Sequence, residues 1–157
     1  DQEEKRLRAV KFSKSSVILP PRLSKRERLL QRANNRIAEG RFLEAKDLFE
    51  LAVDKYGEND EDALFGLGVA SSNLRKPGLA QRYFTKALEV SRDSRISTWS
   101  HIFLGRIHDL SGRRKKALSQ YQAAMITAGA FPLALQAAEK GLQMPFGSEP
   151  PRASSKE

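Results

Sequence analysis

The chain has 157 residues, of which 39% are apolar and 30% are charged, and its formal net charge is +9. This length suits a single domain with a sizeable core, and the apolar content is too high for a disordered chain. Cysteine is absent, which excludes disulfides and cysteine-ligated zinc. No signal peptide is predicted at the acidic start, and no run approaches the ~18 apolar residues of a membrane span.

Residues 1–23 differ in composition from the rest of the chain. Residues 1–28 carry a net charge of +5 and the remainder a net charge of +4, so basic charge is concentrated at the start. Pro20 and Pro21 prevent a helix from running through this segment. We therefore expect residues 1–23 to be a basic linker or the remnant of an upstream domain, in a chain that is a fragment or a processed product.

Helical signals begin at Ser24, which forms a capping-box pattern with Glu27. Gly40, Gly57, Gly112 and Gly129 suit helix ends that need a left-handed residue, and Pro77 and Pro132 suit first turns. No segment alternates like a strand. The sequence therefore predicts an all-α chain with helices over 24–39, 42–56, 60–74, 77–91, 95–111, 114–128 and 132–143.

Three of these segments repeat one spacing of small and aromatic residues. Each has an alanine, an aromatic residue four positions later and a second alanine after three more: Ala45, Phe49 and Ala52; Ala80, Phe84 and Ala87; Ala117, Tyr121 and Ala124. A Leu-Gly pair precedes the second and third sets, at Leu67-Gly68 and Leu104-Gly105. Similarity at a period of about 35 residues predicts stacked helical hairpins, in which small residues allow close approach and the aromatic fills the gap to the next hairpin.

At these residues the chain resembles the tetratricopeptide repeat (TPR) family. The second-helix signature is complete in all three units, whereas the first helix departs from the pattern, with His101 and His108 at its bulky and tyrosine places in unit three. The resemblance implies a right-handed TPR-like superhelix of three helix-turn-helix repeats, over about 24–58, 59–93 and 95–129, within a domain spanning 24–143. We expect a C-terminal capping helix at 132–143 and a disordered tail at 144–157.

The same resemblance implies that the concave side of the superhelix is a binding groove for a protein or peptide partner. The chain also resembles C-terminal TPR modules of multidomain bacterial proteins, so we expect a soluble scaffold that is cytoplasmic or exported to the periplasm, with its compartment left open. Chaperone-binding relatives grip a terminal carboxylate with a clamp of Asn, Lys and Arg, of which only Asn34 is present here. The expected groove residues are Asn34, Ile37, Phe65, Val69, Asn73, Trp99, Phe103 and Arg106.

Catalytic chemistry has little support in the sequence, and we expect neither an enzyme nor a cofactor. His101 and His108 are seven residues apart and share a helix face, but both fall on packing positions and no third metal ligand lies nearby in the sequence. Gly66-Leu67-Gly68 lies within a helix without the preceding strand that a phosphate loop requires. We therefore expect no metal site.

Two other functions stay open as alternatives. A basic strip is expected at two equivalent turns, formed by Arg75, Lys76, Arg113, Arg114, Lys115 and Lys116. It could contact nucleic acid or another anionic surface, although no aromatic residues interleave with it for base stacking, which disfavours nucleic acid. The module could also be an architectural or self-association arm of a larger enzyme, although we favour a monomer.

Overall fold

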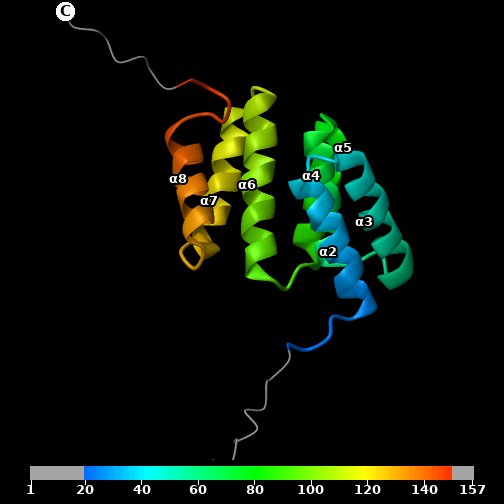
Figure 1. Cartoon of the computed structure of the whole chain (residues 1–157). Helices are drawn as coiled ribbons and strands as arrows, with labels where there is room; N and C mark the ends of the chain where they lie inside the picture. Colours follow the sequence, from blue (N-terminus) through cyan, green and yellow to red (C-terminus); the bar gives the residue numbers. More distant parts are fainter. Residues whose placement is uncertain (1–19, 150–157) are drawn as a thin grey trace, which may run out of the picture.

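The computed structural model describes residues 20–149, and within this range the chain is all helical. Seven helices follow one another with short turns and no strand among them (Figure 1). Residues 1–19 and 150–157, on which parts of the linker and tail predictions fall, lie outside the described residues. The helices are α2 (Lys25–Ala38), α3 (Phe42–Tyr56), α4 (Glu61–Asn73), α5 (Pro77–Val90), α6 (Ser94–Leu110), α7 (Arg114–Ala128) and α8 (Pro132–Gln143).

Local signals place the helix ends within about one residue of the sequence prediction. The Ser24–Glu27 capping box forms, with the Glu27 N–H donating to Ser24 Oγ at 3.1 Å and the Ser24 N–H donating to Glu27 at 2.6 Å. Pro77 and Pro132 open α5 and α8, where the missing N–H has no intrahelical partner to lose. No helix among the described residues has the length and apolar character to cross a membrane.

The turn inside each hairpin needs one residue in the left-handed region. Gly40 and Gly112 supply it with φ values of +74° and +71°, as predicted. In the middle hairpin Arg75 takes this place with a φ of +57°. Residues that carry a Cβ rarely adopt this backbone conformation. All three turns close with the same bond, and in the middle one the Lys76 N–H donates to the Ser71 carbonyl at 2.9 Å.

Gly57 is also left-handed, at +116°, but the prediction for Gly129 was wrong. Gly129 has a φ of −59° and a ψ of −23°, which any residue can adopt. The reason is that α7 ends in a continuing right-handed turn. The Phe131 N–H there donates to the Ala128 carbonyl at 2.8 Å, so no left-handed cap is needed.

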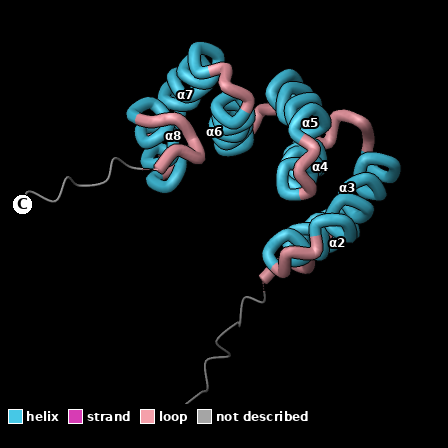
Figure 2. Tube along the Cα trace, turned by 90° about the horizontal axis from the view of Figure 1, so that it is seen from above, coloured by secondary structure: helices cyan, strands magenta, loops and turns pink. Residues whose placement is uncertain are grey.

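The helices form a curved row of antiparallel pairs. Figure 2 shows α2, α4, α6 and α8 along the inner side of the curve and α3, α5 and α7 along the outer side. Successive helices pack on one another along the row, and α8 also contacts α6. The inner helices therefore present one continuous concave face, which Figure 1 shows from the front.

The repeated small and aromatic residues form the core that holds this row together. Phe49, Phe84 and Tyr121 are each at most 1% exposed, and the alanines of the signature are fully buried. Each ring lies against a glycine backbone: a Cβ built on Gly68 would come 2.6 Å from the Phe84 ring, and one on Gly66 would overlap the Phe49 ring. Tyr121 lies between Gly105 of α6 and Gly141 of α8, so α8 packs on α7 as α4 packs on α3.

Candidate functional site

A groove opens on the concave face between α2, α4 and α6. Its volume is about 450 Å³. The lining side chains of α4 and of α6 come from one face of each helix, because residues three and four apart on a helix point the same way, and α2 contributes Asn34. The groove is lined by Asn34, Asp62, Phe65, Val69, Arg95, Ile96, Trp99 and Phe103.

The floor of the groove is a connected set of aromatic rings. Phe84, the buried repeat aromatic of α5, stacks on Phe103 with ring centres 4.9 Å apart and an interplanar angle of 8°. Phe65 packs edge-on against both rings, at 5.7 and 6.0 Å, and Trp99 lies 6.3 Å from Phe103. Phe65, Trp99 and Phe103 are only partly buried. A rigid apolar surface therefore faces the groove, anchored on a core residue from behind.

An ion-pair cluster lies at the starts of α2 and α4, and its member Asp62 also lines the groove. The Arg26 guanidinium lies 2.6 Å from Asp60 and 2.7 Å from Asp62. These bonds raise the pKa of Arg26. Burial disfavours the ionised form of Asp60, but the hydrogen bonds from Arg26 and from the Ala63 N–H outweigh the effect of burial. The pKa of Asp60 is therefore lowered. Asp62 is thus already paired, and the exposed Asn34 supplies neutral polar groups at the rim.

The structure brings five of the eight expected groove residues together: Asn34, Phe65, Val69, Trp99 and Phe103. The other three lie elsewhere. Ile37 packs against the core of the first hairpin, and the Asn73 amide donates to the Val69 carbonyl at 2.9 Å. Arg106 lies next to the groove, with its guanidinium 5.4 Å from the centre of the Phe103 ring.

Asp62, Arg95 and Ile96 also line the groove but were not predicted to do so. All three belong to the first turns of α4 and α6, and their first-turn position on the inner helices is the signal that could have identified them. By the TPR resemblance, two further places of the chaperone clamp fall on Leu30 and Gly66, and both are buried. Leu30 is 7% exposed, and Gly66 lies under the Phe49 ring.

The two histidines have separate surroundings. The His101 Nδ1 lies 2.8 Å from the side-chain oxygen of Gln120 on α7. His108 is 6% exposed, and burial lowers its pKa, with Arg113 and Lys116 adding to the effect. Among residues 20–149, no three His, Cys, Asp or Glu side chains come together in a way that could hold a metal ion.

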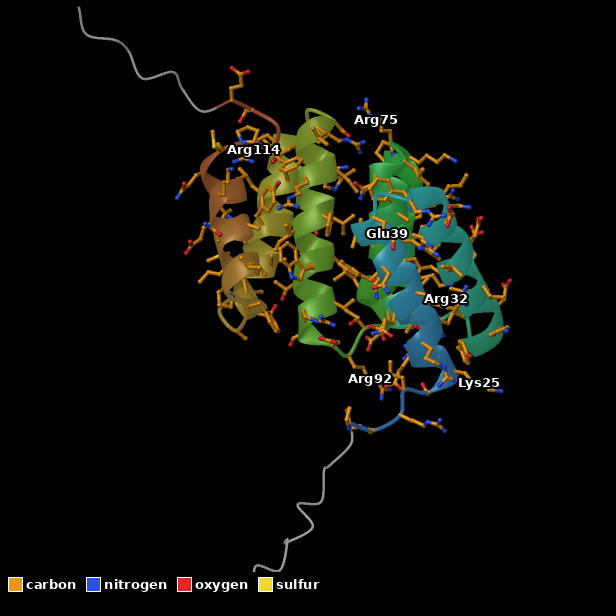
Figure 3. All side chains as sticks on the ribbon, viewed as in Figure 1. Lys25, Arg32, Glu39, Arg75, Arg92 and Arg114 are labelled. Atoms are coloured by element: carbon orange, nitrogen blue, oxygen red, sulfur yellow. The ribbon has the colours of Figure 1, made fainter. Side chains whose placement is uncertain are left out.

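The residues of the expected basic strip lie at the turns of the second and third hairpins. Figure 3 shows Arg75 and Arg114 at the same end of the molecule. Arg75, Lys76, Arg113, Lys115 and Lys116 are exposed. Arg114 differs, because its guanidinium lies 3.0 Å from the fully buried Asp109 carboxylate and donates to the Leu142 carbonyl at 3.1 Å.

The fold is that of a TPR-like helical repeat protein. Nine chains among the solved structures match it. One is PcrH, solved in complex with the chaperone-binding region of PopB. The match has a TM-score of 0.60 and 21% sequence identity, and it covers 76% of this chain and 94% of that one. No family model matches the sequence, and no curated protein matches it either.

Proposed function

We propose that the chain is a peptide-binding scaffold. Its helices form a right-handed superhelix of three TPR-like repeats capped by α8, and a segment of a partner protein lies in the groove between α2, α4 and α6. The observation that carries this proposal is the floor of Phe65, Trp99 and Phe103, three large rings left partly exposed side by side on a concave surface.

Physical chemistry favours a peptide as the occupant of this groove. Partly exposed aromatic rings in a concave, rigid site provide anchors for apolar side chains at little entropic cost. The side-chain amide of Asn34 can donate a hydrogen bond to a peptide backbone and accept one from it. Nothing in the lining provides a nucleophile paired with a base, so binding rather than reaction is the function that these residues suit.

The structural match adds support from a protein of similar fold. PcrH was solved with a bound region of another protein, PopB. By analogy in fold, we infer that the partner of this chain is also a protein segment. The basic strip is a weaker candidate because Arg114 is already bound to Asp109.

A pair of matched variants tests the groove. Short random peptides displayed on phage are selected on the immobilised chain, and calorimetry measures the enriched peptides against Asn34→Arg and Asn35→Arg. Both residues are exposed on α2, but only Asn34 lines the groove. We expect Asn34→Arg to weaken binding by about tenfold or more, since it fills the groove, and Asn35→Arg to leave it unchanged. Equal effects of both variants, or salt-sensitive binding of oligonucleotides in place of peptides, would contradict the proposal.

A further inference from the structure

The segment after α8 folds back onto the third hairpin, where it contacts the last turns of α6. Pro145 to Ser148 form a tight turn, in which the Ser148 N–H and hydroxyl both donate to the Pro145 carbonyl, at 3.2 and 2.6 Å. Gly147 takes the third place of this turn with a φ of +83°, which favours glycine. The turn therefore presents the Phe146 side chain in a fixed direction.

Two contacts hold Phe146 in place. Its N–H donates to the carboxylate of Asp109 at 2.8 Å, and its ring centre lies 4.8 Å from the Arg106 guanidinium. The Asp109 carboxylate is itself oriented by Arg114 and by the Tyr121 hydroxyl, which donates at 2.9 Å. A rigid acceptor for one backbone N–H thus lies beside a cation that attracts an aromatic face.

Around this segment lies a second cavity of about 300 Å³, between α6 and α8. Its walls come from Arg106 of α6, from Tyr121 of α7 and from Ala137, Lys140 and Gly141 of α8, and residues 144–148 complete them. Arg106 follows the groove residues Trp99 and Phe103 by seven and three positions, so it lies on the same face of α6. The Arg106 wall of the cavity therefore adjoins the groove.

Arg106 connects the cavity with the groove. Its guanidinium lies near two rings, Phe103 of the groove floor at 5.4 Å and Phe146 of the tail at 4.8 Å. It forms no ion pair with any residue in the described part of the chain, although it is partly buried. A peptide that runs from the groove along α6 would meet the Arg106 face next.

We propose that the Arg106–Asp109 surface beside the α6–α8 cavity is a second subsite of the groove, which accepts an aromatic residue in a turn, and that the chain's own Met144–Ser148 segment covers it in competition with the partner. This inference rests on the proposed function. Phe146 acts as the internal stand-in for a partner's aromatic residue, bound through its ring to Arg106 and through its N–H to Asp109.

The exposure of the segment indicates that it can leave. Phe146 is 44% exposed, and residues 145–149 are all exposed, whereas α8 keeps its own buried contacts through Ala134, Ala138 and Gly141. Segments with few buried contacts open locally at small cost without unfolding the domain. A partner that offers the same ring and N–H, together with groove contacts, would displace Phe146.

The subsite can be tested without knowing the partner. The probe is a synthetic peptide of residues 143–149 with blocked ends, titrated to millimolar concentration onto the full chain carrying Phe146→Ala and followed by NMR at the Arg106 side chain. We expect saturable shifts in this variant, shifts at least about threefold smaller in the wild type because its own tail occupies the site, and none with a peptide in which alanine replaces phenylalanine. Absence of saturable shifts in Phe146→Ala would overturn the subsite.

The competition is tested with the groove peptides selected above. We expect Phe146→Ala to bind them about three- to tenfold more tightly than the wild type, and Leu133→Ala, an exposed apolar change on α8, to bind them equally. Equal affinity in all three chains would overturn the competition. A large loss of thermal stability in Phe146→Ala would make Phe146 a structural clip and would also overturn it. If no peptide is enriched at all, the proposed function fails, while the titration with the tail peptide still decides the subsite.

Discussion

The ring of Tyr121 lies directly on the backbone of Gly141, so that a Cβ at Gly141 would come within 2.5 Å of the ring. Tyr121 is 1% exposed and cannot swing away, because Gly105 lies against the same ring from α6. We expect Gly141→Ala to lower the free energy of unfolding by about 1–3 kcal/mol, since α8 must shift outward. Urea unfolding followed by circular dichroism measures this change.

Gly78→Ala is the matched control for that substitution. Gly78 also lies in a helix, but a Cβ there meets nothing within 4 Å. Alanine should therefore stabilise α5 slightly, by up to about 1 kcal/mol, through its higher helix propensity. A Gly141→Ala chain as stable as Gly78→Ala would show that α8 does not pack on Tyr121 as described.

Arg75 carries the strain of a left-handed residue in the middle hairpin, at a place that is glycine in the other two. We expect Arg75→Gly to raise the free energy of unfolding by about 0.5–1 kcal/mol, because glycine adopts this φ without a Cβ clash. The reverse change, Gly112→Arg, should lower it by about 1 kcal/mol. Thermal melts of the two variants with opposite signs support this turn geometry, and destabilisation by Arg75→Gly would contradict it.

His108 gives the fold a pH-dependent term. Burial, with help from Arg113 and Lys116 and against the opposing charge of Asp109, lowers its pKa below the ordinary value of 6.5. The unfolded chain therefore binds this proton more readily than the folded chain. The contribution of neutral His108 to the free energy of unfolding is fully present above about pH 6.5. It falls as the pH drops toward the pKa of His108 in the folded chain, by at most about 1.4 kcal/mol for each pH unit.

The measurement is urea unfolding at about pH 7 and about pH 5 for the wild type and for His108→Gln. The variant should lose less stability than the wild type on acidification, because glutamine does not titrate. An equal loss in both chains would assign the pH dependence to other groups.

The Asp109 carboxylate is fully buried and binds three donors, from Arg114, Tyr121 and Phe146. Asp109→Asn removes the charge and leaves Arg114, which is 30% exposed, with a weaker partner. We expect Asp109→Asn to lower the free energy of unfolding by about 1–3 kcal/mol. The loss is smaller than for a fully buried ion pair, because water reaches Arg114. Asp54→Asn, an exposed change on α3, should cost less than about 0.5 kcal/mol.

The helices could be predicted from the sequence because local chemistry sets their ends. The Ser24–Glu27 capping box, Pro77 and Gly40 each act within one turn of the chain. The alanine–aromatic spacing indicated which successive helices form each antiparallel pair. The strained Arg75 could have been found from the same spacing, since it aligns with Gly40 and Gly112. Gly129 could not, because glycine permits a left-handed turn without requiring one.

The lining residues of the groove were predictable, whereas the contacts between hairpins were not. Phe65 and Phe103 follow from the face of each inner helix, whereas the Arg26–Asp62 pair joins residues on different hairpins and depends on the rotation between them. The contact of Phe146 with Asp109 spans 37 residues and depends on where α8 directs the tail. Sequence patterns report local geometry, and these contacts are set by packing.

The groove proposal is tested most directly by NMR mapping of an enriched peptide onto the folded chain. We expect the largest shifts at the Asn34 side-chain amide and at the indole N–H of Trp99, the single tryptophan of the sequence and a residue of the groove floor. Largest shifts at Arg82 and Thr85, which are exposed on the outer helix α5, with Asn34 and Trp99 unmoved, would contradict binding in the concave groove.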